Sequence, residues 1–210
     1  MIDAFVEGVR SIVQVCHLVI IAPVASTILA ARGRWQAAAG AVTGVVLGGW
    51  FFTTNRFGNI TDTQLRITAT LLIVAVVSLG FPGLFRREHP RWTAGVGDVV
   101  GSPVATFGIV ALVATMVTQW WRPCVGEELG SILTRGPRDP WGQFLPSAGF
   151  MLGIATPLIL LGLVFAAVRP KEAVTDTLAW VGSGLTLVLA TSVIAGQHGE
   201  IVSRLFQWSQ

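Results

Sequence analysis

The residues best suited to chemistry in this sequence are its only two cysteines, Cys16 and Cys124. In an apolar chain a cysteine is most often a small buried hydrophobic side chain. Each of these two, however, lies near a proline that can interrupt a helix. Pro123 directly precedes Cys124, and Pro23 follows Cys16 by about two helical turns. These positions favour a functional role for both thiols.

A helix break before Cys124 would favour the reactive form of its thiol. The stretch 99–134 is too long for one straight membrane crossing, so we expect a half-helix to begin near Cys124. A helix N-terminus supplies free N–H groups and positive potential that favour a thiolate, and Arg122 acts in the same direction. Glu127 and Glu128 oppose thiolate formation, although both also suit the dipole at a helix start. A capping role and a functional role are therefore both open for them.

Metal handling is a second chemical possibility. Four side chains supply the soft and borderline ligand atoms that Zn²⁺ or Cu⁺ prefers: Cys16, His17, Cys124 and Glu127. No Cys-x-x-Cys or His-x-x-x-His spacing reinforces this set. A lone intramembrane histidine is more often a hydrogen-bonded packing residue, so we expect no resident metal and treat a metal carrier as an alternative.

The composition predicts that these residues lie in a membrane. Of the 210 residues, 52% are hydrophobic and only 12% are charged, and the mean hydropathy is +0.69. A soluble domain carries roughly 25% charged residues, because its surface must stay in contact with water. The composition therefore argues against a soluble enzyme, a disordered chain and a secreted disulfide scaffold. The net charge of +3 comes from scattered loop arginines and gives no indication of nucleic-acid binding.

Transmembrane helices are the elements expected to position the cysteines. Backbone groups in lipid must be hydrogen-bonded within the protein, which favours helices. We predict an all-α integral membrane protein, one domain over residues 1–210, with both termini on one side. Six stretches contain no Asp, Glu, Lys or Arg, and each can hold the roughly 20 apolar residues of one span: 11–31, 35–55, 67–85, 99–121, 140–168 and 177–199.

The loop cations indicate an orientation. The first, third and fifth loops hold seven Lys and Arg residues, and the opposite side holds six. Because cytoplasmic loops carry an excess of cations, this margin of one favours odd-numbered loops in the cytoplasm and extracytoplasmic termini. Several tryptophans are expected at the two membrane interfaces, among them Trp35, Trp50 and Trp141.

The two halves of the chain resemble each other. Segment 26–33 (STILAARG) is echoed by segment 131–136 (SILTRG), and a tryptophan follows each. A three-helix repeat must be inserted upside down relative to its copy, as in many transporters. We therefore predict two inverted three-helix repeats, about 1–90 and 91–210, with the first and fourth helices bent beside the cysteines.

Glycines four residues apart predict close helix packing. Such small faces let helix backbones approach where lipid offers no hydrophobic drive for association. We expect them to pack within the bundle, and a contact with a partner subunit is the alternative. The two sets are Gly40, Gly44 and Gly48, and Gly149 and Gly153.

The second half resembles a known family. Segment 121–126 (WRPCVG), followed by 129–133 (LGSIL), is similar to the second cysteine motif of the cytochrome c biogenesis CcdA family, the six-helix relative of the DsbD transmembrane domain. Segment 149–157 (GFMLGIATP) resembles the fifth helix of that family, and the likeness reaches 195–197 (AGQ). The first half matches in layout, so the resemblance covers the whole chain.

The resemblance implies a thiol–disulfide relay. Such proteins take electrons from cytoplasmic thioredoxin and pass them across the bacterial cytoplasmic membrane to an extracytoplasmic thioredoxin-like acceptor, without a bound cofactor. Cys16 and Cys124 would be the redox-active pair near the membrane centre. The supporting residues would be Pro123, which shapes the break, together with Arg122, Glu127, Pro23 and His17.

Two departures from the family pattern keep other functions open. Val15 and His17 flank Cys16 where the family usually has an adjacent proline, and Glu127 stands where a proline usually follows the second cysteine. A redox-silent relative, retained as an accessory subunit of a larger membrane complex, is the first alternative. A metal or small-molecule carrier that uses the cysteine–histidine cluster is the second.

Overall fold

The computed structural model describes residues 2–12, 15–53, 61–80, 102–118, 141–168, 170–197, 199–200, 203–204 and 207. Within these ranges the regular elements are helices and none is a strand. The prediction of an all-α protein is therefore confirmed for this part of the chain. The helices are α1 (Ile2–Ser11), α2 (Val15–Ala30), α3 (Trp35–Thr53), α4 (Asp62–Gly80), α6 (Pro103–Val117), α8 (Phe144–Ile154), α9 (Thr156–Val168) and α10 (Glu172–Ile194).

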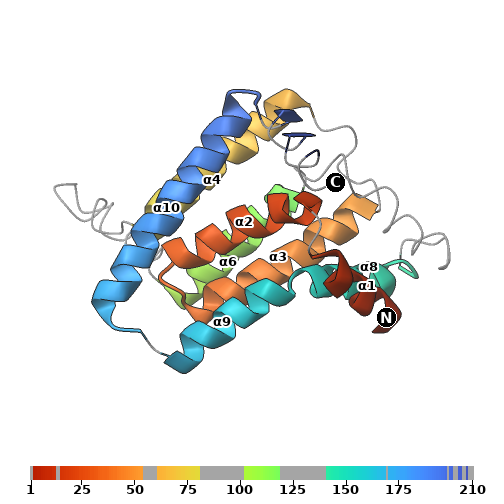
Figure 1. Ribbon diagram of the computed structural model, residues 1–210, viewed down its shortest axis with the longest axis horizontal. Helices are drawn as coiled ribbons and strands as arrows, with labels where there is room; N and C mark the ends of the chain where they lie inside the picture. The colour runs from red at the N-terminus through yellow and green to blue at the C-terminus, as the bar shows by residue number, and fades with distance from the viewer. Residues whose placement is uncertain are drawn as a thin grey trace.

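Helix α2 lies at the centre of a bundle. It contacts α3, α4, α6, α9 and α10, while α3 also packs along α6 and α10 also packs along α4. Followed along the chain, α2, α3, α4, α6, α9 and α10 alternate in direction between the two ends of the bundle (Figure 1). Any residue on α2 is therefore surrounded by elements from both halves of the sequence.

Large apolar side chains cover the outside of the bundle, and small ones fill much of its interior. Ala37 and Ala41 are fully buried, whereas Leu163, Trp180 and Val188 are 60%, 68% and 68% exposed. A soluble monomer rarely exposes a contiguous apolar patch larger than a few hundred Å². Among the described helices, α4 and α10 are long and apolar enough to cross a membrane, and α8 with α9 is a third span if the bent pair is counted as one.

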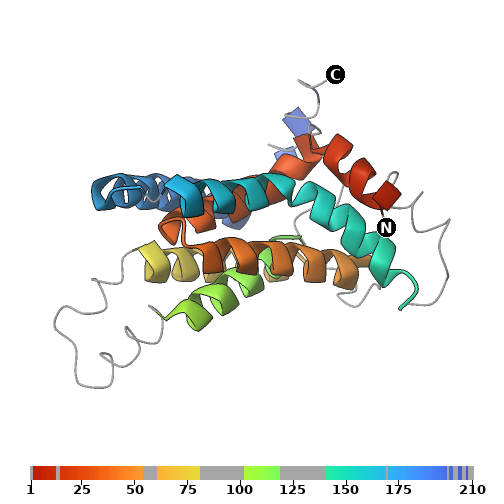
Figure 2. The ribbon, with the colours of Figure 1, turned by 90° about the horizontal axis from the view of Figure 1, so that it is seen from below.

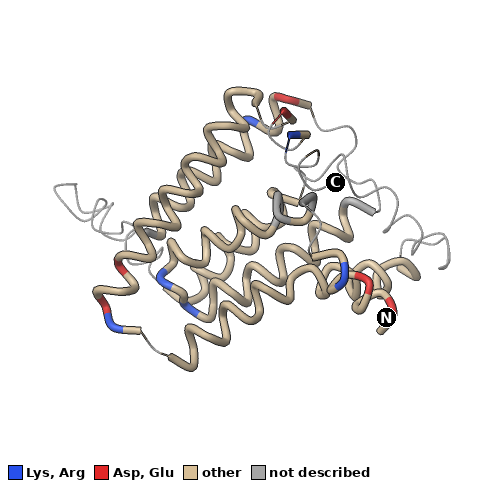
Figure 3. The backbone as a smooth tube through the Cα atoms, in the orientation of Figure 1, with Lys and Arg blue, Asp and Glu red and all other residues tan. Residues whose placement is uncertain are grey.

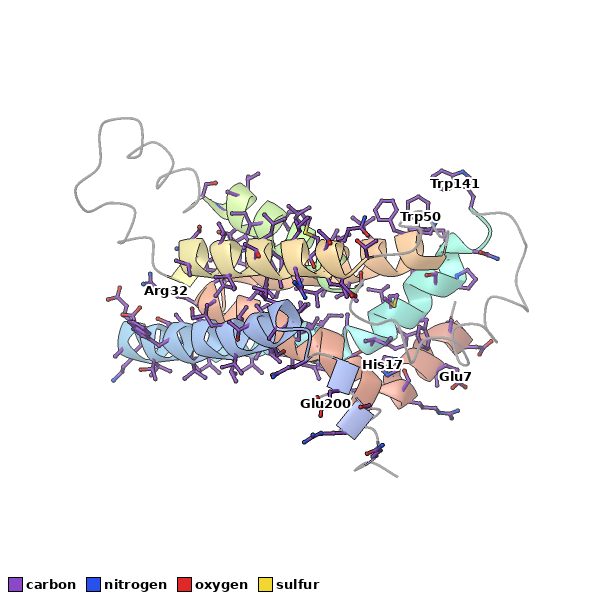
Figure 4. All side chains as sticks on the ribbon, turned by 90° about the horizontal axis from the view of Figure 1, so that it is seen from above. Glu7, His17, Arg32, Trp50, Trp141 and Glu200 are labelled. Atoms are coloured by element: carbon purple, nitrogen blue, oxygen red, sulfur yellow. The ribbon has the colours of Figure 1, made fainter. Side chains whose placement is uncertain are left out.

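The charged residues of the described chain gather toward the two ends of the bundle (Figure 3). The helix surface between them carries no described Asp, Glu, Lys or Arg. Trp35 and Trp50 lie at opposite ends of α3, about 22 Å apart at 1.5 Å per residue. Arg32 lies toward one end, where it pairs with Asp176, and Glu7 and Glu200 lie toward the other (Figure 4).

The turn from α2 to α3 is fixed by its backbone and by an ion pair. Arg32 and Gly33 both have positive φ, at 58° and 63°, and the Gly33 N–H donates to the Ile28 carbonyl at 2.9 Å, which terminates α2. The Arg32 guanidinium then reaches Asp176 of α10 at 3.1 Å. The turn between the first two long helices is thus tied to the start of the last one.

The first charge-free stretch, 11–31, is not one helix. Helix α1 ends at Ser11, Ile12 is in a turn, and α2 begins at Val15. The chain therefore changes helix before Cys16, whereas α2 continues through Pro23 without ending. Within the described chain, the expectation that Pro23 disrupts the first helix is wrong, because neighbouring helices and local polar groups can satisfy the backbone of a proline-containing membrane helix.

The fifth charge-free stretch, 140–168, is divided into α8 and α9, which are bent by 55° at Ala155 (Figure 2). Pro157 explains the break, since it lacks an N–H group and its ring clashes with a carbonyl one turn earlier. The sequence predicted bends in the first and fourth helices: the first stretch does change helix just before Cys16, whereas the bend in the fifth stretch was not predicted. Helix α6 ends at Val117, and the predicted break at 121–124 lies outside the described residues.

Candidate functional site at the start of α2

Cys16 lies in the first turn of the central helix. Helix α1 has ended five residues earlier, at Ser11, and α2 begins at Val15. The first turn of a helix has free N–H groups and positive potential, which favour a thiolate over a thiol. The backbone of Cys16 thus lies at a helix start, the position that the sequence suggested for Cys124.

His17, the next residue, is a buried packing and hydrogen-bonding group. It is 2% exposed, and its Nδ1 lies 2.6 Å from the Ser11 carbonyl oxygen at the end of α1. A carbonyl can only accept, so Nδ1 carries the proton and donates. The imidazole also meets the Phe150 ring edge-on, with 6.2 Å between centroids. His17 is therefore hydrogen-bonded and packed through Nδ1 and its ring, an arrangement compatible with both roles that the sequence left open, since a metal-bound histidine also donates its second N–H to a carbonyl.

Two glycines bring α8 to this site. Helix α1 packs along α8, and a Cβ added to Gly153 would lie 2.8 Å from Gly8 Cα. Only glycines allow the two backbones to approach this closely. The approach places Phe150 beside His17, which is labelled in Figure 4, so part of segment 149–157 lies next to the residue that follows Cys16.

Pro23 has a packing role seven residues further along α2. The Ser26 hydroxyl donates to the Pro23 carbonyl at 2.7 Å and is also hydrogen-bonded to the Thr186 hydroxyl of α10. Gly182 of α10 lies against the α2 backbone, where a Cβ would be 2.6 Å from the Ser26 carbonyl oxygen. Small polar residues thus join α2 to α10, at the position where the sequence suggested a helix break.

The glycine face of α3 packs onto α6, which confirms that it is a packing surface within the bundle. A Cβ on Gly40 would lie 3.2 Å from the Phe107 carbonyl carbon, and one on Gly44 would lie 2.6 Å from Ala114 Cβ. The Thr115 hydroxyl of α6 also donates to the Gly44 carbonyl at 3.1 Å. In the second set, Gly153 faces α1.

The other predicted site residues fall outside the part of the chain that the structure describes. They are Arg122, Pro123, Cys124 and Glu127, together with the side chain of Cys16. Among the described residues, no group of three or more His, Cys, Asp and Glu side chains could hold a metal ion.

Sequence reasoning missed α1 as a separate element and missed Ser11 and Phe150 as the partners of His17. A signal for α1 was present in the spacing of Ala4, Gly8 and Ser11, which places three small residues on one helical face. No comparable signal identified Phe150.

The comparisons with known proteins give no relative. No protein-family model matches the chain, and no significant match is found among curated proteins or solved structures. For the part of the chain that the structure describes, the geometry therefore defines only a class, a helical bundle with two or three helices that are long and apolar enough to cross a membrane.

Proposed function

We propose that this chain is a six-span integral membrane protein in which Cys16 and Cys124 relay reducing equivalents from cytoplasmic thioredoxin to an extracytoplasmic thioredoxin-like acceptor. In each half-cycle a thioredoxin dithiol is oxidised to a disulfide while the Cys16–Cys124 disulfide is reduced to a dithiol. Two electrons and two protons move together, and the reverse exchange on the other face reduces the acceptor. The cysteines themselves carry the electrons, so no bound cofactor is required.

The distribution of charge supports the six spans. Helices α2, α3, α4, α6, α9 and α10 alternate in direction, and the described charges lie toward the two ends of the bundle (Figures 1 and 3). Large apolar side chains such as Val188 face outward between these ends. Lipid tolerates such a surface, whereas charged side chains within the hydrocarbon are costly.

The contacts between helices support the inverted repeats. Exchanging α2, α3 and α4 for α6, α9 and α10 converts the α3–α6 contact into the α9–α2 contact, and the α2–α10 contact into the α6–α4 contact. The pairs α2–α6, α3–α9 and α4–α10 convert into themselves, and each is also in contact. Paired helices run in opposite directions (Figure 1), as inverted repeats require.

The observation that carries the relay is the position of Cys16 relative to the end of α6. Helix α2 begins at the end of the bundle where α6 terminates, and the two helices are in contact (Figure 1). Thr118, directly after α6, lies against Gly48 of α3. Cys124 is six residues beyond Thr118, a reach of at most about 21 Å for an extended chain. Both cysteines are therefore close along the chain to helix ends at the same side of the bundle, which supports the proposed pair.

Thiol trapping tests the relay. Cells that produce wild type, Cys16→Ser or Cys124→Ser are acid-quenched, and free thiols are labelled with a mass-shifting maleimide, with and without thioredoxin. We expect a wild-type disulfide that opens when thioredoxin is present, and a mixed disulfide with thioredoxin in one of the two serine variants.

Free thiols in wild type under oxidising conditions, together with normal cytochrome maturation in both serine variants, would contradict the relay. That result would favour the redox-silent accessory subunit. A disulfide that thioredoxin never opens would also reject the proposed electron donor, since exchange requires access by the attacking thiolate.

A further inference from the structure

The surface of α1 is divided into three faces. Ala4, Gly8 and Ser11 are buried against the rest of the protein, and α1 packs along α8. At 100° per residue, six of the other residues fall into two further groups, and the partly buried Val9 lies on the apolar side. The charged face consists of Asp3, Glu7 and Arg10, and the exposed apolar face consists of Ile2, Phe5 and Val6.

The direction of α1 differs from that of the bundle. Helix α1 packs alongside α8. Helix α8 is bent by 55° from α9, and both α1 and α8 are inclined to the long axis of the bundle (Figure 2). A helix of ten residues is about 15 Å long, only half of a hydrocarbon core. Helix α1 is therefore too short and too inclined to form a span.

Aromatic residues mark a membrane boundary toward the same end of the bundle. Trp50, near the end of α3, contacts Trp141 and Phe144, with ring centroids 5.4 Å and 5.5 Å apart. Trp50, Trp141, Glu7 and His17 all lie toward the end opposite Arg32 (Figure 4). Tryptophans concentrate where acyl chains meet headgroups. The positions of Trp50 and Trp141 therefore indicate that α1 lies near this boundary, without any use of the α1 sequence.

We propose that α1 is an interfacial helix, with Ile2, Phe5 and Val6 among the outer acyl chains of the bilayer and its charged face in water. The inference rests on the membrane-spanning part of the proposed function and not on the redox relay. Lipid is the occupant that fits, because Ile2, Phe5 and Val6 are exposed, as are large apolar side chains of the bundle, and α1 lies toward the end that carries Trp50 and Trp141 (Figure 4). An amphipathic helix in this position buries its apolar face about 5–10 Å into the headgroup and acyl boundary.

The charges of α1 predict how this contact responds to lipid composition. Its side chains include two carboxylates and one guanidinium, so there is no basic cluster to attract anionic headgroups. Insertion should therefore depend on apolar area alone and change little between neutral and anionic lipids.

Spin labels on the full chain test the proposal. Single cysteines replace Val6, Glu7 or Val188 in a background with Cys16→Ser and Cys124→Ser, and each labelled protein is reconstituted into phosphatidylcholine vesicles with and without phosphatidylglycerol. The label at Val6 should collide mainly with oxygen, which concentrates in the bilayer. The label at Glu7 should collide mainly with a water-soluble nickel chelate. The label at Val188, which is 68% exposed on α10, should report the deepest position.

Each other outcome rejects a distinct part of the reasoning. If the Val6 label is in water while the Val188 label is deep in the bilayer, the interfacial position of α1 is rejected and the membrane spans are not. A Val6 label shielded from both oxygen and nickel would mean that a second copy of the chain covers the face instead of lipid. A Val188 label in water would overturn the spans, and the interfacial position with them.

Discussion

At the scale of single residues, His17 shows what sequence could and could not predict. Its pattern, a lone histidine in an apolar stretch, indicated a hydrogen-bonded packing role, and the Nδ1 contact to the Ser11 carbonyl agrees. Its partners depend on a turn between α1 and α2 and on the approach of α8. Both are tertiary features that a single charge-free stretch does not encode.

Removing the imidazole should destabilise the start of α2. In His17→Ala the buried Ser11 carbonyl loses its donor and Phe150 loses a ring contact. An unsatisfied buried acceptor costs about 1–3 kcal/mol, so the melting temperature in detergent should fall. His17→Asn is the matched control, because its amide N–H can replace Nδ1–H and should recover much of the loss. Equal melting temperatures for His17→Ala and wild type would show that the hydrogen bond has no stabilising role.

At the scale of elements, the sequence predicted the helical character of the chain better than it predicted where each helix begins, ends or bends. The first predicted span begins at Ser11 and α2 begins at Val15, a difference of four residues. The prolines were harder to interpret, since Pro23 is accommodated inside α2 whereas the fifth stretch bends beside Pro157. A proline weakens a helix wherever it occurs, and the neighbouring helices determine whether the chain bends there. The glycine spacing, by contrast, predicted the α3 packing face correctly, because only backbone contact requires glycine every fourth residue.

The α3–α6 contact should be sensitive to a single methyl group. In Gly44→Ala the new Cβ would meet the Ala111 carbonyl and lie 2.6 Å from Ala114 Cβ, so the helices must separate. Overpacking of this kind costs about 1–3 kcal/mol. The same substitution at Gly108, where a Cβ would meet nothing within 4 Å, is the control. It should be neutral or slightly stabilising, because alanine is the better helix former.

Chemical unfolding in detergent measures both glycine variants. The free energy of unfolding should fall for Gly44→Ala and remain unchanged or rise for Gly108→Ala. Equal losses at the two positions would mean that the α3–α6 backbone contact is looser than the distances indicate.

At the scale of the whole molecule, the two halves of the chain are interleaved. Helix α2 of the first half lies between helices of the second, the Arg32–Asp176 pair joins the two halves at one end, and α1 joins α8 toward the other. Residue echoes such as segments 26–33 and 131–136 indicated a repeat, but they could not predict these cross-contacts. The echo compares residues along the chain, whereas the contacts depend on how the two halves enclose each other.

The alternating directions of the helices make a topology prediction that does not depend on redox activity. Glu7 and Glu200 lie toward the end of the bundle opposite Arg32 (Figure 4). Lys171 lies on the Arg32 side, because it precedes α10, whose first turns carry the Asp176 partner of Arg32. In a background without native cysteines, Glu7→Cys and Glu200→Cys should react together with a membrane-impermeant maleimide added outside intact cells, and Lys171→Cys should react only after permeabilisation. The excess of loop cations on the Lys171 side sets this orientation. Labelling of all three from outside would reject the six alternating spans. Labelling of Lys171→Cys alone would agree with the six spans and reverse the predicted orientation. The orientation is the less strongly supported part of the prediction, because it rests on a margin of one cation.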